Sequence, residues 1–354
     1  MGTTLLSAPH EEQKAGQIDI ALEEMRHDTV QVARFLISDL EQKNVKVDTL
    51  LPGLSAYTYV AETDTIPYKV FIASTGNPGH AIKLVLFPGD RVSITGSVLD
   101  YQVKGSGFND RLRAVQYACR PYEEKMDSLF SIMTEEIYNK EYLPAWRQRD
   151  SVQADYIRRH PDDDLSLFLL GEIKGKWIDG LYPLLTGKVK NGPFASIAQF
   201  IDKGLQRKKK FEDSKQRIKE GVEAPGFTLR DIGGRNLALS SLRGKYVVLD
   251  FWGSWCGWCI KGFPDMKNCY DKYKGKLEIL GIDCNDTEEK WRAAVAQYGL
   301  PWLHVRDDDQ SDVRLLYAVQ GYPTKVVVDP DGRIARIFLG EDPAFYQYLD
   351  ELFN

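Results

Sequence analysis

In the first third of the chain, short runs rich in β-branched and aromatic residues are separated by Gly, Pro, Asn and Asp. Several runs alternate apolar and polar positions, which is typical of strands with one buried face. The predicted strands cover residues 31–37, 56–60, 68–72, 82–87 and 91–96. We therefore predict an all-β domain over residues 16–108, built as an antiparallel sandwich or barrel.

Beyond residue 109 the apolar positions change to a helical spacing. Leu129, Ile132, Met133 and Ile137 fall on one face of a helix, and similar patterns recur further on. We predict a helical connector over residues 109–221. The basic run near its end interleaves acidic residues and has no aromatic platform, so we interpret it as a solvated helix face and not as a nucleic-acid site.

From residue 222 to residue 354, strand-like and helix-like blocks alternate. Residues 246–252 form a continuous apolar run, which is expected for a strand covered on both faces. The blocks that follow are a helix at 256–273, a strand at 277–283, a helix at 288–298, an extended piece at 302–305, a helix at 311–319, strands at 325–329 and 333–339, and a helix from 344. This alternation predicts an α/β domain.

Composition and charge narrow the possible functions. The 354 residues are 43% hydrophobic and carry a formal net charge of -5, which favours a folded protein and gives no general attraction to nucleic acid. No run approaches the roughly 18 apolar residues that a membrane-spanning helix needs. The five cysteines are too few for a disulfide-stapled scaffold.

Residues 1–15 have neither a basic start nor a long apolar stretch, so they do not read as a signal peptide. We expect a leader that is disordered or not native. An export signal or lipidated segment could have been removed ahead of it, so the compartment stays open.

The strongest chemical signal is a pair of cysteines two residues apart. Residues 247–259 read VVLDFWGSWCGWC, a buried strand and a tight turn before a helix. Cys256 would begin that helix, where free N–H groups and the helix dipole favour a thiolate and should lower its pKa below the usual value of about 8.5. Cys256 is the candidate nucleophile, and Cys259 is the candidate resolving thiol that attacks the mixed disulfide.

A zinc site is the structural alternative for this pair, but it would need a second pair of ligands. Cys269 and Cys284 stand alone, and the sequence has no second Cys-x-x-Cys and no His-x-x-x-His. We predict no metal and no cofactor beyond the redox-active Cys256–Cys259 disulfide. For Cys119, Cys269 and Cys284 we expect buried or inert thiols, and for His304 we expect a core residue whose hydrogen bonds are satisfied.

The C-terminal part resembles thioredoxin-like proteins, and within them the TlpA/ResA-like thiol–disulfide oxidoreductases of bacterial envelopes. The resemblance rests on APGFTL at 224–229, LSSLRGK at 239–245, FWGSWC at 251–256, an added helix and strand at 287–305, and GYPT at 321–324. It implies a thioredoxin-like fold for residues 222–354 and thiol–disulfide exchange on proteins.

The family pattern also implies roles for single residues. Pro323 occupies the place of a cis-proline that faces the cysteines, with the Tyr322 backbone exposed to pair with a substrate strand. Asp250 matches a buried aspartate that accepts the proton of the second cysteine. Together with Tyr322, the candidate substrate-binding residues are Trp255, Gly257 and Trp258. The dipeptide between the cysteines departs from the usual family pairs and lacks histidine, which favours a reductase over an oxidase.

The N-terminal half resembles a β-rich domain of unknown function that precedes TlpA-like modules in envelope proteins of Gram-negative gut bacteria. The matching stretches are LFPGDRVSITG at 86–96 and VKGSGFND at 103–110. This resemblance names no chemistry, and a docking role for the domain is a hypothesis. The family implies a periplasmic or envelope location, protein disulfide substrates and a membrane electron donor.

Three readings therefore compete. The first is a protein disulfide reductase or isomerase. The second is a redox-silent adaptor with a thioredoxin fold. The third is a peroxiredoxin, but its Pro-x-x-x-Thr-x-x-Cys site would need proline and threonine where Leu249 and Gly253 stand.

Overall fold

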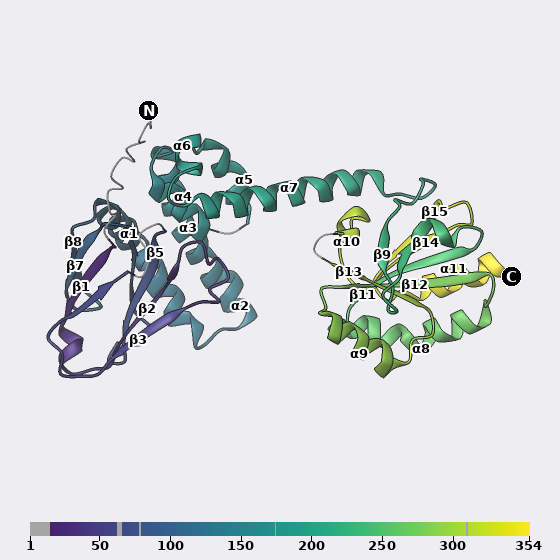
Figure 1. The fold of residues 1–354 in the computed structure, drawn as a ribbon, viewed down its shortest axis with the longest axis horizontal. Coiled ribbons are helices and arrows are strands. Elements are labelled where there is room, and N and C mark those ends of the chain that lie inside the picture. Colours follow the sequence, from purple (N-terminus) through teal and green to yellow (C-terminus); the bar gives the residue numbers. More distant parts are fainter. Residues whose placement is uncertain (1–14, 62–65, 78, 174, 309–310) are drawn as a thin grey trace, which may run out of the picture. The chain divides into compact units, whose positions relative to one another are not determined.

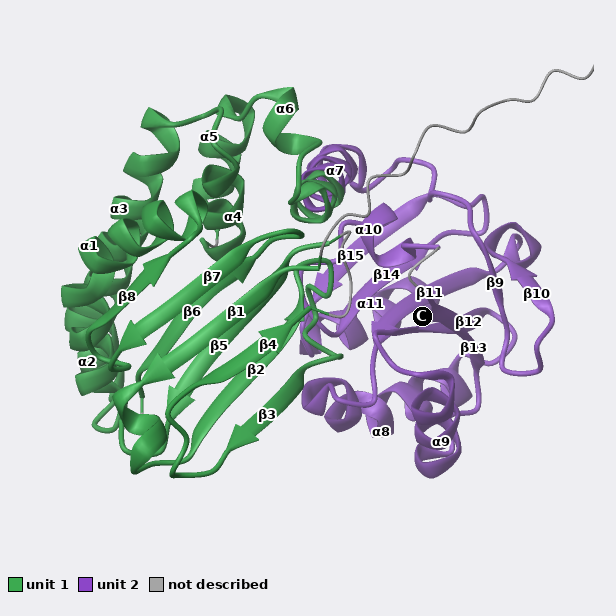
Figure 2. Ribbon diagram, turned by 60° about the vertical axis from the view of Figure 1, so that its left-hand side comes forward, with its two compact units in different colours: residues 1–203 green, residues 204–354 purple. Residues whose placement is uncertain are grey.

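The computed structural model describes residues 15–61, 66–77, 79–173, 175–308 and 311–354. Two compact units divide the chain, residues 1–203 and residues 204–354, and Figure 2 colours them separately. The division falls within the helix α7 (Ala195–Arg217). The leader expected at residues 1–15 lies outside the described residues except for its last position.

Unit 1 begins with two four-stranded sheets, counted over the described residues. Their strands are β1 (Gln17–Leu22), β2 (Val30–Leu36), β3 (Lys46–Leu50), β4 (Tyr57–Val60), β5 (Tyr68–Ser74), β6 (Ala81–Leu86), β7 (Arg91–Gly96) and β8 (Tyr101–Lys104). One sheet has the order β4-β1-β7-β8 and the other β3-β2-β5-β6. Alternate side chains of both sheets, such as Ile20 and Ile72, meet in one apolar core. This confirms the strand-rich domain and makes it a sandwich.

The pairing differs from the expected antiparallel sandwich at one place. Strands β1 and β7 are parallel, with Ile18 opposite Val92. A long stretch of chain separates these two strands, so no hairpin turn fixes their direction. Strands β1, β3 and β8 were also missing from the sequence prediction. In β3, Leu50 alone is buried, so the strand shows almost no alternation of buried and exposed side chains. Strand β1 does alternate, and its sequence pattern could have predicted it.

Helices follow the strands in unit 1. They are α1 (Gly107–Phe130), α2 (Glu135–Ile137), α3 (Leu143–Arg159), α4 (Asp164–Glu172), α5 (Trp177–Leu181), α6 (Gly187–Lys190) and α7, with the shorter η2 (Tyr138–Tyr142) and η3 (Tyr182–Leu184) among them. A short turn, η1 (Glu23–Arg26), lies earlier, between β1 and β2. Phe108 of α1 packs against Phe87, 5.0 Å between ring centroids, and against Phe168 of α4 at 5.8 Å. The helices up to residue 203 therefore belong to the same compact unit as the sandwich. The domain limits expected at 109 and 222 stay predictions.

Unit 2 is the α/β part of the chain (Figure 1). Its strands are β9 (Thr228–Arg230), β10 (Asn236–Ala238), β11 (Tyr246–Trp252), β12 (Leu277–Cys284), β13 (Leu303–Asp307), β14 (Thr324–Val328) and β15 (Ile334–Leu339). Its helices are α8 (Gly257–Lys272), α9 (Glu288–Tyr298), α10 (Val313–Leu316), α11 (Pro343–Phe353) and the short turn η4 (Leu239–Leu242). The main sheet has the order β13-β12-β11-β14-β15.

The sheet direction changes beside its central strand. Strands β11, β12 and β13 run parallel, and β14 and β15 pair antiparallel to their neighbours. From β11 onward the elements agree with the predicted ones within about two residues, except that the helix expected at 311–319 is only α10; β9 and β10 were not predicted. Ala318, with φ 50, adopts a left-handed conformation that a helix cannot contain, so the helix ends before it.

Strand β11 is buried on both faces, which explains its continuous apolar run. Val247 and Phe251 face one core, and Val248 and Trp252 face the core that includes the cysteines. Because side chains alternate along a strand, Asp250 lies on the same face as Val248 and Trp252. The one charged residue of this strand therefore points toward α8. No helix of the described part has the length and apolar character to cross a membrane.

Candidate active site

Cys256 and Cys259 form a disulfide at the start of α8, with 5.3 Å between their Cα atoms. Strand β11 ends at Trp252, so the pair follows the carboxyl end of the central strand. Cys256 is the N-cap residue of α8, and its Sγ accepts a hydrogen bond of 3.1 Å from the backbone nitrogen of Cys259. The same N–H would stabilise a thiolate on Cys256 in the reduced protein.

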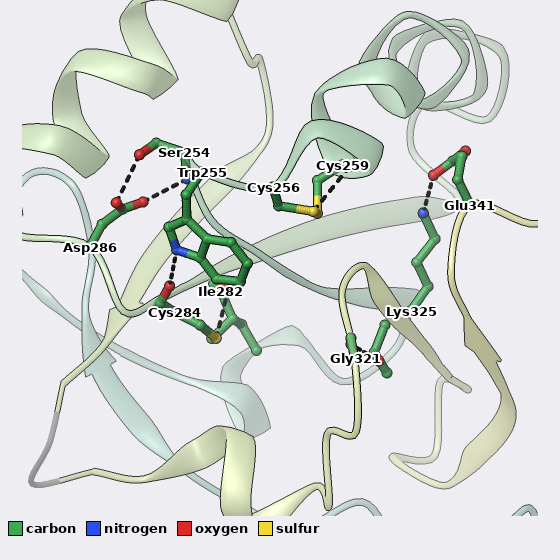
Figure 3. The surroundings of a disulfide bond; sticks show 11 residues. Ser254, Trp255, Cys256, Cys259, Ile282, Cys284, Asp286, Gly321, Lys325 and Glu341 are labelled. Carbon is green, nitrogen blue, oxygen red and sulfur yellow. Dashed lines mark hydrogen bonds and ion pairs between the residues drawn. A yellow bond between two sulfur atoms is a disulfide. The ribbon is translucent and has the colours of Figure 1, made fainter. Parts of the chain in front are cut away.

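Two tryptophans stand exposed at the disulfide. The side chains of Trp255 and Trp258 are 51% and 63% exposed. The indole Nε1 of Trp255 donates to the carbonyl oxygen of Cys284 at 3.1 Å, which fixes the ring (Figure 3). The ammonium of Lys261 lies over the Trp258 ring, 4.9 Å from the ring centroid. Because large exposed apolar side chains are typical of binding surfaces, this edge of the site can receive an apolar partner.

The residues before β14 lie next to this edge. The Tyr322–Pro323 peptide bond is cis. The Tyr322 ring meets Trp255 edge to face, with 5.0 Å between the centroids. The fold thus brings the expected candidates Tyr322 and Pro323 to the site that Trp255 opens. Their catalytic and binding roles stay predictions.

Asp250 lies in the interior beneath the site, 3% exposed. No described residue gives its Oδ1 a hydrogen bond. Burial raises the pKa of Asp250 to about 6, although the cation of Lys325 acts in the opposite direction. A carboxyl group with this pKa can take up and release a proton near neutral pH, which is what a proton acceptor for Cys259 would need.

Two residues that the sequence interpretation missed lie beside Asp250. Lys325 faces it across the β11–β14 pair, and the Lys325 Nζ is 2.7 Å from Oε2 of Glu341. Figure 3 shows this ion pair together with the disulfide. Lys325 is the one charged residue of the buried strand TKVVV. That charge was the available signal in the sequence, because a lysine in a buried strand needs a partner. No pattern in the sequence around Glu341 indicated that its side chain lies near Asp250.

A second acidic group supports the turn before the cysteines. Asp286 accepts hydrogen bonds from the nitrogen and the hydroxyl of Ser254 (Figure 3). Burial and the neighbouring Asp286 carboxylate raise the pKa of Asp283 to about 9, so Asp283 is protonated at neutral pH. The pKa of Asp286 is lowered: burial raises it, but the Asp283 carboxyl and the Ser254 donors outweigh burial.

The other cysteines are buried thiols outside the disulfide. Cys119, Cys269 and Cys284 are free. Burial raises the pKa of Cys119 to about 12 and that of Cys269 to about 11, and it raises the pKa of Cys284 further. His304 is buried as well, and burial lowers its pKa to about 4. Among the described residues, no group of three or more His, Cys, Asp or Glu could hold a metal ion.

Comparisons with known proteins converge on residues around this site. A family model described as the AhpC/TSA family matches residues 221–337. The thiol-disulfide oxidoreductase ResA of Bacillus anthracis is 37% identical over 132 residues, which are 37% of this chain and 76% of that protein. ResA of Bacillus subtilis strain 168 is 35% identical over 127 residues, 36% of this chain and 70% of that protein.

A solved structure also matches. The thioredoxin domain of a thiol-disulfide oxidoreductase from Bacteroides vulgatus is 31% identical, with a TM-score of 0.36, over 38% of this chain and 99% of that one. For the peroxidase reading, the AhpC/TSA description is a weak hint, and the site residues oppose it. Leu249 is a core side chain and Gly253 has no hydroxyl, where a peroxidatic site would have proline and threonine.

Proposed function

The chain belongs to the ResA thiol–disulfide oxidoreductases, and we propose that it works as a protein disulfide reductase of the cell envelope with Cys256 as the attacking thiolate. The family membership carries with it the thioredoxin-like fold of unit 2 and the oxidoreductase activity. The observation that carries the assignment of the nucleophile is the bond from the Cys259 nitrogen to Cys256 Sγ at the start of α8.

The proposed reaction passes two electrons to a substrate disulfide. The Cys256 thiolate attacks one substrate sulfur, the substrate S–S bond breaks, and the other substrate sulfur leaves as a thiolate that takes a proton from water. Asp250 then accepts the proton of Cys259. The Cys259 thiolate attacks Cys256 Sγ, the mixed disulfide breaks, and the second substrate thiolate leaves. The substrate is reduced, and Cys256–Cys259 is oxidised to the disulfide.

Substrate recognition is proposed to use the exposed edge of the site. The two exposed tryptophans, Trp255 and Trp258, offer apolar surface on either side of Gly257. The Tyr322 backbone, two residues before β14, is proposed to pair with an extended substrate segment in the manner of an added strand. A folded or unfolded protein with an accessible disulfide fits this arrangement better than a small polar molecule does.

The location and the electron donor are finer proposals. The resemblance to envelope oxidoreductases supports a periplasmic or envelope location, and a protein there needs electrons from across the membrane to be reduced again. Unit 1 is proposed to position the redox unit at its partner. A membrane protein that reduces Cys256–Cys259 in a reconstituted system would support this proposal.

A redox titration tests the proposed function. The full chain is equilibrated in buffers of graded thiol and disulfide content, and Cys256–Cys259 is followed by thiol trapping in the wild type, C256A, C259A and the control C269A. A reversible couple at or below roughly -250 mV supports a reductase, and a value near about -120 mV would make it an oxidase. A chain without a reversible couple would be an adaptor, and rapid consumption of hydrogen peroxide would favour the peroxidase.

A further inference from the structure

Lys325 is a lysine in the interior of unit 2. It lies opposite Asp250 in the register of β11 and β14, and its side chain is 2% exposed. Its ammonium is paired with Glu341 at 2.7 Å (Figure 3). An ammonium is tolerated in a protein interior when a carboxylate neutralises it. Glu341 therefore supplies the countercharge that keeps Lys325 inside.

Glu341 reaches this place because the active-site helix leaves room for it. Gly262 lies three residues after Cys259 on α8, and a Cβ added to Gly262 would lie 2.3 Å from the Glu341 Oε2. The hydroxyl of Tyr346 donates to Oε1 of Glu341 at 2.5 Å and lies 3.4 Å from the Gly262 carbonyl oxygen. The Glu341 carboxylate is thus packed against the backbone of the helix that carries the cysteines.

The charged groups around Asp250 come from few elements. Its neighbour on β12 is Gly281, which has no side chain. Helix α8 contributes the disulfide, and α11 contributes the Tyr346 hydroxyl, which is bound to Glu341. After burial, the groups that act on the pKa of Asp250 are Lys325, which lowers it, and Glu341, which raises it. The carboxyl group of Asp250 therefore feels both charges of one buried ion pair, Lys325 and Glu341, in a medium of low dielectric constant.

We propose that Lys325 and Glu341 are positioning residues of the disulfide site, which act through Asp250 by balancing a cation against an anion beside its carboxyl group. The inference rests on the proposed role of Asp250 as proton acceptor of Cys259. Without Glu341, the unopposed Lys325 would hold Asp250 ionised at lower pH. Without Lys325, Asp250 would stay protonated to higher pH, and Cys259 would lose its acceptor at neutral pH.

The test separates the two thiol steps with a chromogenic aromatic disulfide. The reduced full chain releases one aromatic thiol when Cys256 attacks and a second when Cys259 resolves the mixed disulfide, and C259A gives the first release alone. The rate of the second release is measured against pH. For the wild type we expect this rate to rise with a midpoint near about 6, because the acceptor must be ionised.

The two substitutions should move this midpoint in opposite directions. We expect E341Q to lower it and K325M to raise it, each by about 1 pH unit. E341D keeps the charge and should keep the wild-type midpoint. E223Q, a matched change in the exposed Arg243–Glu223 pair, should not move it. On a D250N background neither substitution should change the profile of the second release.

The outcomes separate the inference from the proposed function. If the wild type shows no second release, the proposed reaction fails. If both releases occur but E341Q leaves the midpoint in place, or shifts it on the D250N background as well, the inference is overturned and the reductase stands. Should K325M not fold, E341Q and E341D decide the question by themselves.

Discussion

The carboxylate of Asp286 accepts two hydrogen bonds from Ser254, one of 2.6 Å from the backbone nitrogen and one of 2.8 Å from the hydroxyl. Ser254 lies in the turn between β11 and Cys256, and Asp286 lies just beyond the end of β12. The turn that leads to Cys256 is therefore tied to the neighbouring strand by a charged acceptor, a type of hydrogen bond that is stronger than one between neutral groups.

Replacing Asp286 should loosen this turn. We expect D286A to lower the free energy of unfolding by about 2 kcal/mol, because it leaves the partly buried Ser254 nitrogen without its charged partner, and S254A to cost about 1 kcal/mol. Urea unfolding measures both. The lowered pKa of Asp286 means that its contribution is present above the pKa of the unfolded chain and is lost as the pH falls through the folded pKa. The difference between wild type and D286A should therefore shrink in acid. D271N, at an exposed aspartate of α8, is the control.

Asp250 should make the protein less stable as the pH rises. Its pKa is raised to about 6 in the folded protein, so the folded state binds a proton that the unfolded state has already lost. The contribution is complete below the unfolded pKa of about 4 and is lost as the pH rises through about 6, which amounts to about 3 kcal/mol. D250N removes this loss. We expect it to match the wild type near about pH 4 and to be more stable near about pH 8. Equal pH dependence of unfolding in both proteins would contradict the assignment.

Replacing Gly262 by alanine should destabilise the protein. Alanine in place of a helical glycine normally gains about 1 kcal/mol. At Gly262, however, the added Cβ would collide with the Glu341 carboxylate, and pushing that group aside leaves Lys325 buried without its countercharge. A broken buried pair costs about 3 kcal/mol or more, so G262A should be less stable than the wild type by about 2 kcal/mol. The control is G204A, because nothing lies near the Cβ position of that helical glycine, and it should stabilise. Thermal unfolding of both variants decides the matter.

Only the paired cysteines should react in the folded protein. In the reduced chain we expect a maleimide at about pH 8 to label Cys256 first, since thiolates react and a helix N-terminus favours them. Cys119, Cys269 and Cys284 are buried with raised pKa values. They should react only after unfolding, when all five cysteines of the chain become available. Mass spectrometry of the labelled peptides is the measurement. Rapid labelling of Cys269 in the native state would contradict its burial.

Local patterns were sufficient for most of unit 2. The apolar run of β11 and the cysteine spacing depend on neighbours in the chain, and the elements around them were therefore predictable. The ion pair of Lys325 with Glu341 was not, because it joins a strand to a turn 16 residues later and depends on a missing side chain at Gly262. The Asp286–Ser254 contact spans 32 residues and escaped notice for the same reason.

In unit 1 the sequence predicted strands but not their arrangement. The parallel pairing of β1 with β7 joins residues that are more than 70 positions apart in the sequence, and no turn motif predicts this pairing. The helices expected as a connector pack on the sandwich through Phe87, Phe108 and Phe168, each of which reads locally as an ordinary apolar position. Long-range packing of this kind is decided by shape, which a pattern of hydrophobic positions does not encode.

Trp258 provides a test of whether the exposed edge binds protein substrates. Its side chain is 63% exposed beside the disulfide and touches Lys261 through a cation–π contact that is itself at the surface. Because the ring is not part of the core, W258A should leave the free energy of unfolding within about 0.5 kcal/mol of the wild type. It should also leave the Cys256–Cys259 potential unchanged, since the backbone N–H that stabilises the Cys256 sulfur is retained.

The effect of W258A should depend on the size of the substrate. An aromatic side chain at the centre of a protein interface commonly contributes about 2 kcal/mol, which corresponds to about a 30-fold loss in kcat/KM for a protein disulfide. A small chromogenic disulfide makes few contacts beyond its sulfur atoms, so its kcat/KM should change less than about 3-fold. Phe200, an exposed aromatic residue of α7, gives the control F200A, which should alter neither rate. If W258A slows both substrates equally, Trp258 acts on the thiols and not on substrate binding, and the binding edge must then be sought at Trp255 and Tyr322.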